Sequence, residues 1–354
     1  MGALCTGGYQ MRVQTLRTIA GKEFRDHVRS RRFLALLAVI LIITGTGTFS
    51  GMVQFHKSLD RYHDALTVVS GEDEPFGTST SSKPSIMWVF HMIEMTTATL
   101  SAFMGIAMGF DLVTREKESK SLKILLSNPI YRDEVITGKA LGGVAAIALA
   151  VAIALGVSCA VLLIGGIVLS PTQMIRTLIF GLFTVLFIAT FFMIALFFST
   201  IASESGTAFI ASVLVLVLIA VILPFFAYNP MVLDAVLGEP PECPEEAYST
   251  DISYEESLAL LDEYDAENEA YWNTRNTLIT AAMISSPAWI YNAATAAVTA
   301  LPPADDGVQD YSPGTILSTL LNSWYIFAAL VAMLVMPAFF FGLAWVKFAR
   351  MDLR

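Results

Sequence analysis

The sequence predicts an all-α, polytopic membrane protein with six transmembrane helices and both termini in the cytoplasm. Two observations support this fold class. First, 55% of the residues are hydrophobic and only 15% are charged, whereas a soluble domain has about 45–50% apolar residues. Second, apolar runs long enough to cross a bilayer, which takes about 20 residues per helix, recur along the chain.

Six apolar runs are predicted to be spans, because a helix satisfies its own backbone hydrogen bonds inside lipid. The third run is long enough to tilt or to project beyond the bilayer. The predicted spans are 33–55, 85–110, 135–169, 174–201, 207–228 and 321–348.

The basic residues predict the direction of these spans. Segments 12–32, 111–139 and 347–354 hold 16 of the 21 Lys and Arg residues, and six spans place all three segments on one side. The positive-inside rule makes that side the cytoplasm of a multi-pass protein in the cell (plasma) membrane. Segment 229–320 holds sixteen acidic residues and one basic residue, Arg275, so the net charge of −10 belongs to the outer face. This charge distribution predicts contact with the lipid bilayer and no binding of nucleic acid.

The chain is therefore divided into four parts. These are a cytoplasmic N-terminus with an amphipathic helix (1–32), spans one to five (33–228), an extracellular acidic helical insertion (229–320), and the last span with a cytoplasmic tail (321–354). Whether translation starts at Met1 or at Met11 stays open, since a cleaner helical pattern begins at Met11.

Two features are predicted inside the acidic insertion. Ser253-x-x-Glu256 is a capping box that opens a helix. The moderately apolar segment 276–300 is interpreted as a re-entrant or membrane-surface helix pair broken at Ser286-Pro287, with a seventh span as the alternative. The insertion itself could guard an exit, bind a cationic partner, or act only as a stabilising cap.

The N-terminal segment is predicted to form an amphipathic helix. Five apolar residues follow helical spacing on one face: Val13, Leu16, Ala20, Phe24 and Val28. The residues of functional interest are Lys22, Glu23, Phe24, Arg25 and Arg29. Such a helix lies at the inner membrane surface, with its basic side toward anionic headgroups. A plain topology signal is the simpler alternative.

The connection between spans two and three is predicted to contain a helix over 114–126. Leu122, Leu125 and Leu126 share an apolar side, and Asn128-Pro129 ends the helix because proline disfavours helical geometry in the residue before it. We interpret this segment as a protein-docking helix, with a solvated helix on the lipid surface as the alternative. Its candidate docking residues are Arg115, Glu116, Lys117, Lys120, Leu122, Leu125, Leu126, Asn128 and Pro129.

Span two carries ionisable residues, which are costly inside a membrane and usually face the bundle interior or a water-filled path. His91 and Glu94 lie one turn apart, and Met95 follows His91 by four residues. They are candidates for a pathway or an interface between subunits. Thioether and imidazole groups could also bind Cu(I), but methionine is equally an ordinary gap-filler, and no metal site is predicted.

Nothing in the sequence predicts catalysis by this chain. Gly138-Lys139-Ala140 lacks both the upstream glycine and the hydroxyl residue of a phosphate-binding loop. The four histidines show no zinc-site spacing. We therefore expect a protein that is not an enzyme, with no catalytic residues and no cofactor of its own.

Several short patterns occur together and in order along the chain. They are Lys22-Glu23-Phe24-Arg25-Asp26, Ser30-Arg31-Arg32-Phe33, Gly109-Phe110-Asp111, Arg115-Glu116-Lys117-Glu118, the stretch 121–129 (SLKILLSNP), Arg132-Asp133-Glu134-Val135 and Gly138-Lys139. In combination the sequence resembles permease subunits of the ABC type-2 transporter family, in the branch linked to gliding and to maturation of copper enzymes. The resemblance covers almost the whole chain.

This resemblance implies partners and roles that composition does not. Two permeases, as a homodimer or a heterodimer, pair around a central pathway, and each docks on a separate cytoplasmic ABC ATPase subunit that binds ATP and Mg²⁺. The N-terminal helix would be the elbow helix, and Arg115–Leu126 the coupling helix. We therefore expect the permease subunit of an exporter. The alternative is a membrane scaffold or mechanotransmission complex that uses an ATPase without moving a solute.

Overall fold

The computed structural model describes residues 2–69, 84–120, 131–248, 253–299 and 324–351. Within these ranges every regular element is a helix, which confirms the predicted all-α class. The chain divides into two compact units, Met1–Leu214 with Tyr291–Arg354, and Val215–Ile290. Each unit is described separately.

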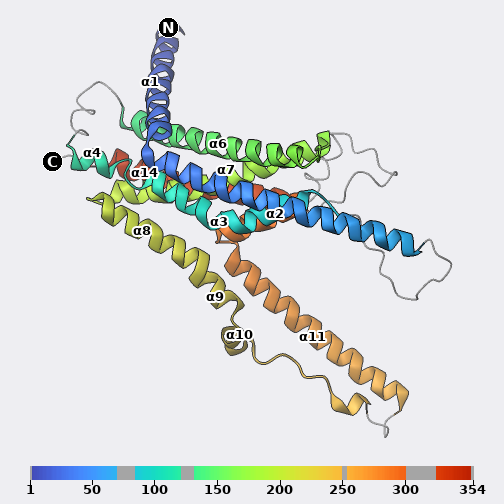
Figure 1. The fold of residues 1–354 in the computed structure, drawn as a ribbon. Coiled ribbons are helices and arrows are strands. Elements are labelled where there is room, and N and C mark those ends of the chain that lie inside the picture. Colours follow the sequence, from blue (N-terminus) through green and yellow to red (C-terminus); the bar gives the residue numbers. More distant parts are fainter. Residues whose placement is uncertain (1, 70–83, 121–130, 249–252, 300–323, 352–354) are drawn as a thin grey trace. The chain divides into compact units, whose positions relative to one another are not determined.

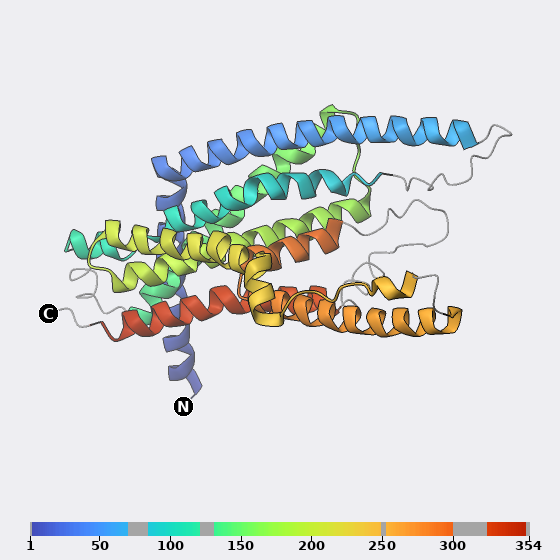
Figure 2. The ribbon, with the colours of Figure 1, turned by 90° about the horizontal axis from the view of Figure 1, so that it is seen from below.

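Long helices that run side by side form the first unit (Figures 1 and 2). The helix α7 (Pro171–Ile201) is central and packs against three others, α3 (Met87–Gly109), α6 (Arg132–Ile164) and α14 (Trp324–Ala349). Another long helix, α2 (Arg31–Val69), packs on α3 and α6. The N-terminal helix α1 (Gly2–Arg29) runs across α6 (Figure 1).

The sequence of α7 explains its central position. It is apolar on all sides, which is typical of a helix buried on every face, and Phe187, Phe191 and Phe192 are fully buried in it. Its start is sharply defined by Ser170. The Ser170 Oγ accepts a hydrogen bond from the Gln173 backbone N–H, and the Gln173 side chain accepts one from the Ser170 N–H at 2.8 Å.

Two pairs of glycines, Gly105 with Gly109 and Gly138 with Gly142, let helices of this unit approach closely. Gly105 and Gly109 of α3 face the backbone of α7, and a Cβ atom at Gly109 would lie 2.6 Å from the Phe192 carbonyl oxygen. Gly142 of α6 faces α1, where a Cβ atom would lie 2.7 Å from the Ala20 carbonyl oxygen. Small residues four apart are the usual device for close packing of helices in membranes.

Five helical segments in the described part of the chain are long and apolar enough to cross a membrane, which confirms a multi-pass membrane protein. They are Arg31–Asp64, Arg132–Ile164, Pro171–Ile201, Ser205–Tyr228 and Leu330–Ala349. The remaining predicted span, 85–110, coincides with α3 but is not one of these five. The count of six spans therefore stays a prediction.

The second unit begins inside a continuous helical segment made of α8 (Ser205–Val217), a π-helical turn (Leu218–Ile222) and α9 (Leu223–Tyr228). The π turn ends two residues before Pro224, whose missing N–H disturbs the regular helical hydrogen bonding. Two further short elements follow, α10 (Pro230–Leu237) and η2 (Glu245–Tyr248).

The long helix of this unit, α11 (Tyr254–Met283), packs against α9. It starts where the sequence predicts, since the Ser253 Oγ accepts a hydrogen bond from the Glu256 N–H at 3.3 Å. It ends at Met283, and α12 (Pro287–Thr299) begins after the break at Ser286. The predicted interruption at Ser286-Pro287 is confirmed, while the four-part division of the chain stays a prediction.

Candidate functional site

The short helix α4 (Thr114–Glu118) follows α3 and is the centre of the candidate site. The predicted single helix over 114–126 is corrected, because α4 ends at Glu118. The Lys120 N–H donates to the Lys117 carbonyl at 3.1 Å, and Lys120 adopts a left-handed conformation with φ of 56°. A residue in that conformation closes a right-handed helix. The predicted docking residues Leu122, Leu125, Leu126, Asn128 and Pro129 lie outside the described residues.

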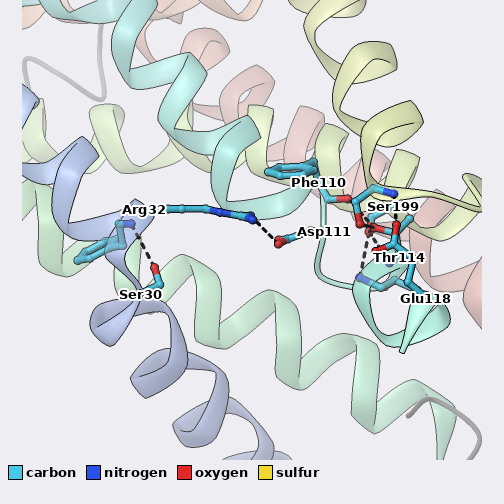
Figure 3. A network of polar contacts seen from close by, with 10 residues as sticks. Ser30, Arg32, Phe110, Asp111, Thr114, Glu118 and Ser199 are labelled. Carbon is cyan, nitrogen blue, oxygen red and sulfur yellow. Dashed lines mark hydrogen bonds and ion pairs between the residues drawn. The ribbon is translucent and has the colours of Figure 1, made fainter. Parts of the chain in front are cut away.

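The start of α4 is anchored on the end of α7. The fully buried Ser199 Oγ accepts hydrogen bonds from the backbone N–H groups of Val113, at 2.9 Å, and Thr114, at 3.1 Å (Figure 3). These amides have no partner within α4, so Ser199 caps the helix from a distant part of the chain. The Ser205 hydroxyl adds a hydrogen bond to the Thr114 Oγ1 at 3.0 Å.

Lys117 ties the body of α4 to the same place. Its Nζ donates hydrogen bonds to the carbonyl oxygens of Thr200 at 2.7 Å, Ala202 at 2.9 Å and Ser199 at 3.4 Å. These carbonyls lie at the C-terminal end of α7, where the helix dipole favours a cation. Burial, with a smaller contribution from the nearby Lys347, lowers the pKa of Lys117. The half-buried Lys117 therefore directs its ammonium group toward the bundle.

Glu118 connects α4 to the start of α8. Its Oε1 accepts a hydrogen bond from the Ser205 backbone N–H at 2.6 Å (Figure 3). This bond lowers the pKa of Glu118. A carboxylate at a helix N-terminus satisfies a free amide and complements the helix dipole.

A buried ionic cluster connects α4 with α1 and α6. The Lys139 Nζ lies 2.7 Å from the Glu116 Oε1 and 2.9 Å from the Glu23 Oε1, and the Lys139 side chain is only 3% exposed. A lysine in such a position is tolerated only with well-placed partners, because removing a charge from water is expensive. The sequence places Lys139 in a basic segment and in the Gly138-Lys139 pattern, but no local signal predicts this buried ionic cluster.

The junction of α1 and α2 lies beside α4. The Ser30 Oγ accepts a hydrogen bond from the Phe33 N–H at 3.1 Å and caps α2. The Arg32 guanidinium forms an ion pair with Asp111 at 2.7 Å, and it lies over the ring of Phe110 (Figure 3). Close by, burial lowers the pKa of His27, although Glu23 and Asp111 oppose the effect.

The three basic segments that the sequence places on one side meet at this end of the first unit. Arg32 reaches Asp111, and Lys139 reaches Glu23. At the start of α6, Arg132 donates a hydrogen bond to the Met351 carbonyl at 2.6 Å, beyond the end of α14. The N-terminal, middle and C-terminal basic segments are therefore joined by direct contacts.

The predicted docking residues of α4 do not form one surface. Glu116 and Lys117 are directed to partners inside the unit, whereas Arg115 and Lys120 are exposed. In α1, Glu23 is buried and Phe24 is half-buried, while three basic residues are exposed: Lys22, Arg25 and Arg29. The structure thus separates residues that hold the site together from residues that can meet a partner.

The second candidate site lies in the bundle, where the Glu94 Oε2 accepts a hydrogen bond from the Thr295 hydroxyl at 2.6 Å. Both residues are fully buried, and they join α3 to α12. The side chains of His91 and Met95 lie outside the described residues. No group of three or more His, Cys, Asp or Glu residues suited to a metal ion occurs in the described part of the chain.

A small cavity of about 40 Å³ lies in the same bundle. Hydroxyl groups are prominent in its lining, from Thr44, Ser101, Ser158, Thr184 and Tyr291. The Tyr291 hydroxyl lies 2.9 Å from the Thr184 Oγ1. Most of the other lining side chains are apolar, and the volume has room for about one water molecule.

Comparison with known protein families shows to which family the chain belongs. A family model described as "ABC-2 family transporter protein" matches residues 17–353, nearly the whole chain. The chain belongs to the ABC-2 transporter family. No curated protein sequence matches it significantly. The resemblance to ABC type-2 permeases is thereby confirmed, while the branch stays a prediction, and the described bundle is the membrane part of an ABC-2 permease.

Proposed function

We propose that this ABC-2 protein is the permease subunit of an exporter that a separate cytoplasmic ATPase subunit drives through α4. One observation supports the proposal above all others: four helices hold α4 at once. Ser199 and the carbonyls around Thr200 tie α4 to α7, Glu118 ties it to α8, and Lys139 ties it to α6 and α1. A short helix fixed in this way moves only together with the ends of the spans.

The mechanism in this chain is mechanical. ATP binding and hydrolysis shift the ATPase between conformations, and α4 transmits that population shift to the bundle. ATP and Mg²⁺ belong to the ATPase, while this chain supplies the lever and the pathway. Arg115 and Lys120, which are exposed, would contact the ATPase.

The same proposal also gives the orientation of the protein in the membrane and a second permease copy. The end that carries α4 faces the cytoplasm of a cell whose plasma membrane holds the protein, and α1 lies at the inner membrane surface. A second permease copy, identical or related, completes the pathway. Family membership does not favour a scaffold that moves no solute.

The decisive experiment reverses the charge of two exposed basic residues, Arg115 in α4 and Lys120 just after it. We expect the variant Arg115→Glu/Lys120→Glu to lower co-purification of the ATPase from native membranes by at least about tenfold, because like charges across an interface are strongly unfavourable. ATPase turnover stimulated by the permease should fall in parallel. Residue 120 has a left-handed backbone conformation, and glutamate is no more strained in that conformation than lysine is.

The matched control is Lys57→Glu/Arg61→Glu, which makes the same charge change at two positions toward the far end of α2. It should co-purify normally. Both variants should keep the thermal stability of the wild type, which separates lost docking from lost folding. Normal co-purification and turnover of the α4 variant would refute the assignment of α4.

A further inference from the structure

We propose that the cavity between α1, α2, α3 and α4 binds an anionic phospholipid of the phosphatidylglycerol class. The cavity has a volume of about 940 Å³, within the roughly 300–1,000 Å³ that is usual for small-molecule sites. Its wall is built by the end of α1, the start of α2, the end of α3 and α4, with Lys139 of α6. All lining residues belong to this chain, and Arg115 is the one lining residue that the proposed ATPase contact also uses.

The charge of the cavity favours an anion. Its lining contains six Lys and Arg residues and four Asp and Glu residues. Lys139 is already matched by two carboxylates and Arg32 by Asp111. Four cations remain that have no ion pair within the described residues, Lys22, Arg29, Arg31 and Arg115, against one remaining carboxylate in the lining, Asp26. A phosphodiester among several such cations gains charge-assisted hydrogen bonds.

Two buried polar atoms in the lining indicate which headgroup fits. The His27 Nε2 and the Glu116 Oε2 have no hydrogen-bond partner within the described residues. Buried polar atoms are nearly always paired, so each one needs an explanation. The imidazole N–H can donate to a phosphate oxygen, and the free Glu116 oxygen can accept from a hydroxyl group. Phosphatidylglycerol supplies both partners in one headgroup.

The other wall of the cavity explains why the ligand is a lipid. Phe33 and Leu36 come from the first membrane span, and Ala107 and Met108 come from the last turn of α3. The cavity thus passes from a cationic rim to apolar side chains that belong to membrane helices. An amphiphile with an acyl chain satisfies both ends, whereas a free phosphate satisfies only the rim. The part of the rim around Ser30, Arg32 and Asp111 is visible in Figure 3.

The test uses the purified full-length chain in detergent, with bound lipid counted by native mass spectrometry and stability followed by thermal melting. Three probes are titrated: dioleoyl-phosphatidylglycerol, dioleoyl-phosphatidylcholine and glycerol 3-phosphate. The wild type should bind phosphatidylglycerol at least about tenfold more tightly than phosphatidylcholine, since a cationic rim prefers an anionic headgroup. Glycerol 3-phosphate should neither bind nor stabilise at the same concentration.

Matched double variants in α1 and at the start of α2 locate the site. Arg29→Gln/Arg31→Gln removes two lining cations and should weaken phosphatidylglycerol binding roughly 10- to 30-fold. Arg17→Gln/Arg25→Gln removes two exposed cations of α1 that do not line the cavity, and it should change binding less than about twofold. If the first variant does not fold, His27→Phe removes the unpaired nitrogen while keeping an aromatic ring, and it should also weaken binding.

Three results would overturn the proposal. Equal binding of glycerol 3-phosphate would show that the cavity takes a free anion. Equal losses in the two double variants would show attraction to the surface of α1 as a whole. Binding of phosphatidylcholine as tight as that of phosphatidylglycerol would show that the cavity does not select an anionic headgroup.

Discussion

Replacing Lys139 by methionine should release α1 and α4 from α6. Methionine keeps an unbranched chain of similar length, so packing changes little, but Glu23 and Glu116 lose their shared cation. Breaking a buried ion pair from one side costs about 3–5 kcal/mol, because the remaining charge stays buried without compensation. The lower end of that range applies here, since the Glu116 side chain is 19% exposed and water can reach it.

Two comparison variants separate this cause from a general effect of mutation. The triple variant Lys139→Met/Glu23→Gln/Glu116→Gln removes the stranded charges and should recover most of the lost stability, as neutral replacements of buried ionic groups often do. Lys57→Met changes an exposed lysine and should cost less than about 0.5 kcal/mol.

The assay is reversible denaturant unfolding in mixed micelles, combined with limited proteolysis of α1. In Lys139→Met, α1 should become sensitive to protease before the spans unfold, because its closest contacts are with α6. The reasoning fails if Lys139→Met is as stable as Lys57→Met. It also fails if the triple variant is no more stable than the single one, since stranded charge would then not be the cause.

Two further predictions concern packing and pH. Gly142→Leu should cost about 1–3 kcal/mol or more because the side chain would collide with the backbone of α1, whereas Gly156→Leu on the same helix meets open space and should be tolerated. The pKa of His27 is lowered from 6.5, so its neutral form stabilises the fold. This contribution is complete above pH 6.5 and is lost as the pH falls through the lower folded-state pKa. Melting temperatures from about pH 8 to pH 5 should decline less in His27→Gln than in the wild type; parallel declines would refute the role of His27.

The span helices could be predicted because their signal is local and strong. A long apolar run in lipid has to be helical, and the predicted ends at Ile201 and Tyr228 are those observed. The break at Ser286-Pro287 was also predictable, because proline restricts the residue before it. These features depend on the residues nearby and on the surrounding solvent, not on distant partners.

The construction of the α4 site could not be predicted in the same way. The alternation Arg115-Glu116-Lys117-Glu118 resembles a solvated charged helix, yet three of its four charges bond to residues far along the chain. No local pattern pairs Lys117 with carbonyls that lie more than 80 positions away. The end of the helix at Lys120 was missed for a related reason, since left-handed closing residues are usually glycine or asparagine.

Three charged residues of α4 bond inside the unit and Arg115 does not, and this difference decides which variants test docking. Reversing Arg115 and Lys117 together, as the charge pattern alone would suggest, combines two different effects. Lys117→Glu would place a carboxylate against the carbonyls at the end of α7 and disturb the attachment of the helix, whatever docks on it. Arg115 and Lys120 carry no such bond in the described structure. Among the described docking residues, Arg115 and Lys120 are therefore the ones whose change tests contact with the proposed partner while α4 stays attached to its four helices.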